Sequence, residues 1–148
     1  MKRALALATL GLITLTVSVS TAQAAPDLTV TVEESKPITA PGGTFSLAGD
    51  LSDSGTFVFT SFFLAAVPSP VVATVHVTEA LSGTAGTLSI KKQCLSVFIG
   101  FGLSDECQGV VVGETGAYAG LHGIAKCSGI VNFITGIASQ TCELRLKT

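Results

Sequence analysis

Apolar and polar residues alternate along most of the chain, and an alternation of period 2 predicts strands with one buried face. The pattern is clearest in residues 138–147, where Gln140 alone interrupts the apolar face. In residues 71–78, valine and alanine form one face, while Thr74, His76 and Thr78 form the other. No amphipathic helix is expected, because apolar residues do not recur at a period near 3.6.

Eight strands are expected, each bounded by residues that favour turns. They cover residues 28–32, 45–50, 57–63, 71–78, 87–98, 107–112, 121–133 and 138–147. The segment Val67-Pro68-Ser69-Pro70 is expected to interrupt the third strand, because proline cannot donate a hydrogen bond to a ladder. Short strands joined by glycine-rich turns predict a single all-β domain, either a sandwich or an antiparallel barrel.

The first 24 residues have the pattern of a signal peptide. Lys2 and Arg3 precede an apolar run from Ala4 to about Val19, and Ala22-Gln23-Ala24 offers small residues to a signal peptidase. The apolar run is shorter than the roughly 20 residues that span a bilayer. We therefore expect a signal peptide at 1–24, a domain at 25–148, and a secreted or periplasmic product that is not held in a membrane.

Charge excludes one class of partner. Without the signal peptide, six basic residues remain against ten acidic ones, so the expected domain is mildly acidic. Its only basic run is Lys91-Lys92. A nucleic-acid partner is therefore not expected, because such partners call for a basic patch or stripe.

Four cysteines lie in the second half of the chain, at Cys94, Cys107, Cys127 and Cys142. In an exported protein they predict two disulfides, for which three connectivities exist. We expect Cys94–Cys107 and Cys127–Cys142, because each pair lies roughly symmetrically about a predicted hairpin turn. The spacing contains no Cys-x-x-Cys pair, so neither a metal nor another cofactor is expected.

The segment Gly113-Glu114-Thr115-Gly116-x-Tyr118-x-Gly120-x-x-Gly123 carries a family resemblance. It resembles the G-G-T-G-x-aromatic…G signature of plant dirigent proteins and the allene oxide cyclase barrel family. The resemblance extends over residues 43–148 and implies an eight-stranded antiparallel β-barrel, often trimeric. Gly113, Gly116, Gly120 and Gly123 are then turn residues, since glycine reaches positive φ without a Cβ clash. Glu114, Ala119 and His122 depart from the family pattern, and the family's catalytic residues have no counterparts here.

Three residues are candidates for catalysis. His76 could be a general base at the barrel mouth, because histidine titrates near neutrality. His122 could form an acid–base pair with Glu114 if the intervening turn folds back. The alternative for His76 is an exposed residue on the polar strand face, and for the other two a solvated turn.

The leading functional expectation is a secreted barrel that binds an apolar small molecule, or acts as a scaffold, without catalysis. A predominantly apolar interior is expected, because no strand shows two inward ionisable residues. A first alternative is a cyclase or isomerase that shapes a hydrophobic substrate in the cavity. A second is a structural or adhesive extracellular oligomer. A dimer or trimer would suit the adjacent Phe62 and Phe63, which must face opposite sides of a regular strand.

Overall fold

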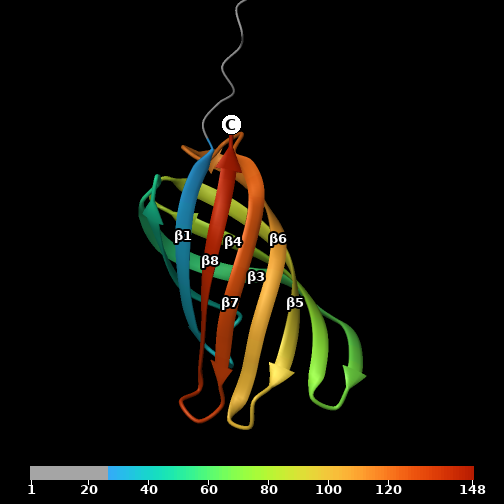
Figure 1. Ribbon diagram of the computed structural model, residues 1–148. Helices are drawn as coiled ribbons and strands as arrows, with labels where there is room; N and C mark the ends of the chain where they lie inside the picture. The colour runs from blue at the N-terminus through green and yellow to red at the C-terminus, as the bar shows by residue number, and fades with distance from the viewer. Residues whose placement is uncertain (1–26) are drawn as a thin grey trace, which may run out of the picture.

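The computed structural model describes residues 27–148 as a closed barrel of eight antiparallel strands (Figure 1). Each strand pairs with the next along the chain, and the last pairs with the first. The strands are β1 (Leu28–Pro37), β2 (Gly42–Gly49), β3 (Asp53–Ser69), β4 (Val72–Gly83), β5 (Gly86–Phe98), β6 (Gly102–Gly116), β7 (His122–Asn132) and β8 (Ile137–Lys147). The architecture is therefore the barrel and not the sandwich. The expected signal peptide lies outside the described residues.

One half of the barrel interior is a packed apolar core. Inward residues alternate with outward ones along each strand, as Val30 and Val32 do on β1 and Leu144 and Leu146 on β8. This half adjoins the barrel end where residue 27 and the C-terminus lie (Figure 1). Its buried members include Phe45, Leu47, Leu81, Leu88, Ile90, Val111, Tyr118 and Leu121. No room remains there for a ligand, so any binding site must lie toward the other end.

Both predicted disulfides are present, Cys94–Cys107 and Cys127–Cys142. Cys107 is also the ladder partner of Cys127, so the four half-cystines form one row across β5 to β8. All four are buried inside the barrel. The two bonds join β5 to β6 and β7 to β8 at the same level of the barrel. They are consistent with an extracellular or periplasmic location.

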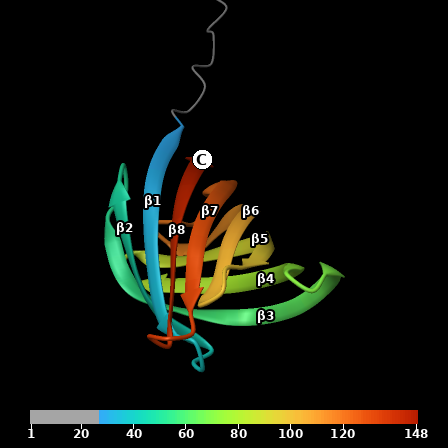
Figure 2. The ribbon, with the colours of Figure 1, turned by 60° about the horizontal axis from the view of Figure 1, so that its bottom comes forward.

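The prediction that Pro68 interrupts the third strand is wrong. β3 continues to Ser69, because pairing with β2 ends at Val58 and the rest of β3 pairs only with β4. A strand edge tolerates proline, since no neighbour needs its missing N–H. Figure 2 shows this hairpin extending past the neighbouring strands. Phe62 and Phe63 on its two faces are 65% and 63% exposed.

The glycine segment forms the end of β6, the turn into β7 and the start of β7. Gly113 lies within β6 and Gly123 within β7, so the expectation that these two are turn residues is wrong. Gly116 has a φ of 63°, and Gly120 has a φ of 86°. A Cβ at position 116 would lie 2.1 Å from the carbonyl oxygen of Ala85, whereas nothing lies within 4 Å of one at position 120. Gly116 is therefore needed both for its backbone conformation and for its closeness to the β4–β5 turn.

Gly116→Val is expected to reduce the free energy of unfolding by at least about 1 kcal/mol, because it combines backbone strain with a steric clash. Gly120→Val is the matched control, since it introduces strain without the clash. Thermal unfolding should give Gly116→Val a lower melting temperature than Gly120→Val. A Gly116→Val variant that melts within about a degree of the parent would refute this role for the glycine.

In residues 27–148 the structure contains no helix that is long and apolar enough to cross a membrane.

Candidate functional site

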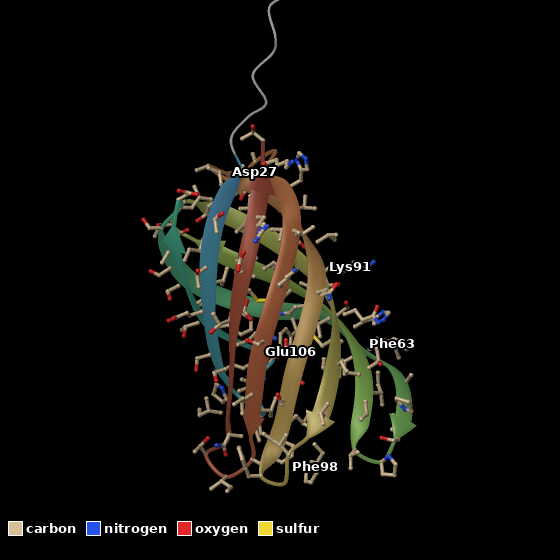
Figure 3. All side chains as sticks on the ribbon, viewed as in Figure 1. Asp27, Phe63, Lys91, Phe98 and Glu106 are labelled. Carbon is tan, nitrogen blue, oxygen red and sulfur yellow. A yellow bond between two sulfur atoms is a disulfide. The ribbon has the colours of Figure 1, made fainter. Side chains whose placement is uncertain are left out.

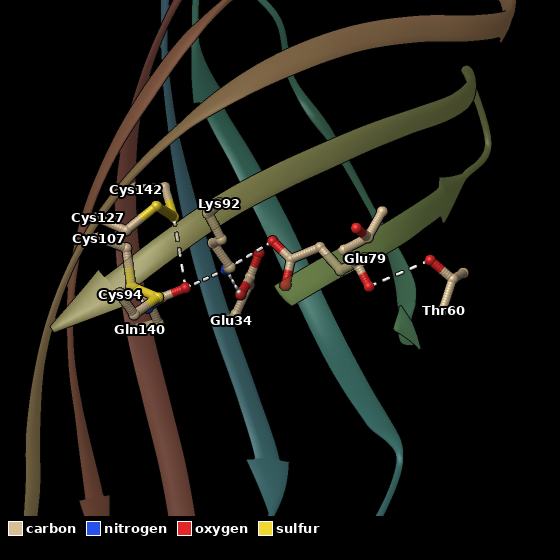
Figure 4. A network of polar contacts seen from close by, with 10 residues as sticks. Glu34, Thr60, Glu79, Lys92, Cys94, Cys107, Cys127, Gln140 and Cys142 are labelled. Atoms are coloured by element: carbon tan, nitrogen blue, oxygen red, sulfur yellow. Dashed lines mark hydrogen bonds and ion pairs between the residues drawn. A yellow bond between two sulfur atoms is a disulfide. The ribbon is translucent and has the colours of Figure 1, made fainter. Parts of the chain in front are cut away.

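A layer of polar side chains crosses the barrel interior directly beyond the apolar core (Figure 4). The Nζ of Lys92 lies 2.6 Å from Glu79 Oε1 and 3.5 Å from Glu34 Oε2, and it also donates to Gln140 Oε1. The charged members are almost completely buried, with 0% of Glu79, 4% of Lys92 and 6% of Glu34 exposed. We call these four residues the polar layer.

Strand register explains why these residues meet. Glu34 on β1 lies directly opposite Gln140 on β8, so both side chains face inward. On the other side of the barrel, Val77 of β4 lies opposite Lys92 of β5, which makes Glu79 a diagonal neighbour of that lysine. The long side chain of Lys92 therefore reaches across the interior to the Glu34–Gln140 pair on the other side of the barrel.

Burial controls the protonation of this layer. Desolvation raises the pKa of Glu79 to about 8, although the positive charge of Lys92 acts in the opposite direction. The negative charge of Glu34 adds to the increase. Near neutral pH the layer therefore contains one protonated carboxyl, which reduces its excess of negative charge.

The polar layer forms the floor of a cavity of about 390 Å³. Glu34, Lys92 and Gln140 contribute to the lining, and the walls are largely apolar. The apolar part of the wall includes Phe57, Phe59, Phe62, Leu64, Ala73 and Val75. Phe62 and Leu64 are 65% and 51% exposed, so the cavity opens to solvent beside the β3–β4 hairpin.

A second pair of polar residues lies in the cavity wall. Asp105 on β6 is the ladder partner of Ser96 on β5, and both residues line the cavity. Burial raises the pKa of Asp105, while a hydrogen bond from Ser96 and the positive charge of Lys92 oppose the increase. The cavity therefore has two carboxyl groups in its lining, Glu34 and Asp105.

The barrel end around the cavity is largely apolar, with Lys36 as a charged residue in the cavity lining there. Residues 37–49, 60–78, 93–104 and 127–142 contain no aspartate, glutamate, lysine or arginine. Exposed apolar side chains gather in the connections at this end: Ile38, Val71, Ile99, Phe101, Phe133 and Ile134. Phe98 lies at this end in Figure 3, whereas Lys91 and Glu106 project from the outer surface of the barrel farther along the strands. The surface around the opening is therefore largely apolar, and the Nζ of Lys36 lies 5.4 Å from the centroid of the Phe59 ring there.

The opposite end of the barrel is closed by Tyr118. Its hydroxyl donates to Asp53 Oδ2 at 2.7 Å, and only 2% of the residue is exposed. Asp53 also accepts from the backbone N–H groups of Ser54, Thr84 and Ala85 and from the Thr84 hydroxyl. This carboxylate therefore joins the β2–β3, β4–β5 and β6–β7 connections, so the cavity has its opening only at the other end.

The three catalytic candidates from the sequence lie on the outer surface. His76, Glu114 and His122 are all exposed, and none of them lines the cavity. His76 contacts the edge of the Phe63 ring, with the ring centroids 6.4 Å apart. His122 Nδ1 lies 3.3 Å from the Gly120 carbonyl oxygen, and no ion pair joins it to Glu114 in the described part of the chain. The structure thus separates these residues from the cavity.

The expectation of a predominantly apolar interior holds for the packed core and for most of the cavity wall. Its premise that no strand carries two inward ionisable residues is wrong, because Glu34 and Lys36 of β1 both line the cavity. The charged members of the polar layer come from three different strands. A usable signal was present, because Glu34 continues the inward positions of Val30 and Val32, and Glu79 continues those of Val75 and Val77.

Within residues 27–148, no group of three or more histidine, cysteine, aspartate or glutamate residues is placed to hold a metal ion. Lys92 occupies the centre of the carboxylate cluster, where its ammonium group takes the place that a cation would need. The polar groups that line the cavity can form hydrogen bonds and ion pairs, and its carboxyl groups can exchange protons. The chain matches no protein-family model, no curated protein and no solved structure.

Proposed function

We propose that the barrel binds an apolar small molecule in its open-ended cavity and does not transform it. The observation that carries this proposal is the cavity itself, with about 390 Å³ of space between aromatic and aliphatic walls. This volume falls within the roughly 300–1,000 Å³ of typical small-molecule sites. Apolar surface buried against such walls contributes about 25 cal/mol per Å² before the costs of association.

The polar layer gives the ligand an orientation. Binding sites combine apolar walls with a few polar groups that fix the position of the ligand. Here the polar groups lie at the floor and the opening is apolar, so the polar end of a ligand faces inward. The largely apolar surroundings of the opening support the same choice of ligand class.

The proposed setting is a secreted or periplasmic protein, after removal of a signal peptide. Two buried disulfides support an oxidising compartment. We further propose kinship with the dirigent and allene oxide cyclase barrels. A closed eight-stranded antiparallel barrel with glycines at the β6–β7 turn is the architecture that the resemblance implies.

A second candidate function is a cyclase or isomerase. The observation in its favour is the presence of carboxyl groups with raised pKa at the cavity, since enzymes tune acids and bases in this way. Asp105 would then be the acid or base, because it lines the cavity whereas Glu79 is enclosed beneath it. Turnover of an epoxide or polyene that is abolished by Asp105→Asn would establish this candidate over simple binding.

Filling the cavity tests the binding proposal. Ala73→Trp places a large ring in the cavity wall, so the affinity for N-phenyl-1-naphthylamine, a neutral apolar fluorescent probe, should fall at least tenfold. His76→Trp places the same ring on the outer face of the same strand and should change affinity by less than about threefold, or under 1 kcal/mol. His76→Ala and His122→Ala should also stay within about threefold.

Fluorescence titration of the four variants measures these affinities. Equal binding by Ala73→Trp and the parent would show that the probe does not occupy the cavity, and a parent that binds no probe would refute the proposed function.

A further inference from the structure

Two buried carboxylate oxygens at the cavity have no hydrogen-bond partner among the described residues. They are Oε1 of Glu34 and Oδ1 of Asp105. Both residues line the cavity, and Glu34 is only 6% exposed. A buried acceptor that lacks a donor costs free energy, so native proteins rarely leave such groups unpaired. The two oxygens therefore mark positions where a donor is missing.

The two lysines of the cavity lining have no spare donor for these oxygens. Lys92 carries three N–H groups, and these serve Glu34 Oε2, Glu79 and Gln140. Its charge is shared among the carboxyls of Glu34, Glu79 and Asp105. Lys36 also lines the cavity, but its three N–H groups serve backbone carbonyl oxygens, those of Pro37, Ile38 and Ala40. A carboxylate ligand would add acceptors and negative charge, and it would leave both oxygens unpaired.

We propose that the cavity selects an amphipathic molecule whose polar end is a primary ammonium group on an apolar chain. This inference rests on the proposed function and specifies its ligand class. The ammonium end would reach the floor, where it donates to Glu34 and Asp105. The chain would lie between Phe57, Phe59 and the other apolar wall residues. A hydroxyl end can supply one donor and no charge, so it satisfies the floor only in part.

Four ligands with the same ten-carbon chain test the inference: decylamine, decanol, decanoic acid and decyltrimethylammonium. Each displaces N-phenyl-1-naphthylamine in a competition titration at neutral pH. We expect decylamine to bind at least tenfold more tightly than decanoate, with decanol between them. Decyltrimethylammonium should bind more weakly than decylamine, because it has the positive charge but no N–H donor.

Two variants assign the preference to the named oxygens. Glu34→Gln and Asp105→Asn should each reduce the ratio of decylamine to decanol affinity at least threefold. Glu33→Gln and Glu106→Gln are matched controls, because these acidic neighbours are exposed on the outer face, and they should preserve the ratio. If Glu34→Gln does not fold, Asp105→Asn carries the test alone.

The outcomes separate the two proposals. Equal affinity for amine, alcohol and acid, or tighter binding of decanoate, would overturn the ammonium inference and leave the apolar binding site intact. An amine preference that survives both Glu34→Gln and Asp105→Asn would also overturn it. A parent protein that binds no N-phenyl-1-naphthylamine would instead overturn the proposed function.

Discussion

Replacing Lys92 by methionine is expected to lower the free energy of unfolding by about 3 to 5 kcal/mol at pH 8. Removing one partner of a buried ion pair leaves an uncompensated charge, and losses of about this size follow. Lys92 serves two carboxyls at once, Glu79 at 2.6 Å and Glu34 at 3.5 Å. Methionine has a similar length, so the change removes the charge and the donors and leaves most of the packing.

The loss of unfolding free energy in Lys92→Met should be smaller at pH 5 than at pH 8. Burial raises the pKa of Glu79 from 4.5 to about 8, so the folded state holds a proton that the unfolded state releases. A group of this kind contributes stability that is fully present below the unfolded pKa and is lost as the pH rises through the folded pKa. In Lys92→Met the opposing attraction is gone, so ionising Glu79 at high pH becomes still more costly.

Denaturant unfolding at both pH values, with the disulfides intact, measures these differences. Lys91→Met is the matched control, because Lys91 is the exposed neighbour on the outer face of β5. The control should stay within about 0.5 kcal/mol of the parent. A Lys92→Met protein as stable at pH 8 as Lys91→Met would show that the polar layer does not depend on its lysine.

Asp53→Ala is expected to lower the free energy of unfolding by at least about 2 kcal/mol. The carboxylate accepts hydrogen bonds from several groups at the closed end of the barrel, and hydrogen bonds to a charged acceptor are strong. The Tyr118 hydroxyl at 2.7 Å and the Thr84 hydroxyl at 2.7 Å both lose their partner. Asp50→Ala is the control, since Asp50 is exposed and accepts one bond, from the Thr29 N–H. Chemical denaturation at pH 7 should show a much smaller loss for the control.

Lowering the pH should remove most of the difference in free energy of unfolding between Asp53→Ala and the parent. Burial acts to raise the pKa of Asp53, but hydrogen bonds from Tyr118, Thr84, Ala85 and Ser54 outweigh it and hold the pKa well below its usual range. A depressed pKa contributes stability above the unfolded value, near 3.8, and this stability is lost as the pH falls through the folded value. A stability gap that stays constant from pH 7 to pH 2 would contradict this role for the carboxylate.

The alternation of apolar and polar residues and the positions of the turn residues were sufficient to predict much of the fold. The alternation in β4 and β8 identified their inward faces, and turn positions identified both disulfides. Strand lengths were harder to predict. The sixth strand was expected at 107–112 but runs from Gly102 to Gly116, because polar residues such as Ser104 and Asp105 resemble a turn when the ladder partners are not known. Pairing with Val97 and Ser96 across the ladder keeps these residues in the strand.

The candidate site depends on information that no single strand contains. Glu34 looks like the polar end of a short strand until β1 is seen to extend to Pro37. Lys92 follows Lys91, so the pair resembles a solvated basic run, although Lys92 is buried. Their contact requires the barrel to close, because it joins β1 to β5 across the interior. Closure and the diameter of the barrel are properties of the whole sheet.

The central claim, that the barrel holds a small molecule, is tested most directly by native mass spectrometry of the protein purified from the organism that makes it. Our account predicts a species heavier than the disulfide-bonded polypeptide by the mass of one organic molecule per chain, which an organic solvent extracts. It also predicts that the extracted protein takes up one decylamine. A protein that shows only its polypeptide mass after purification, and again after incubation with decylamine and decanol, would contradict the account.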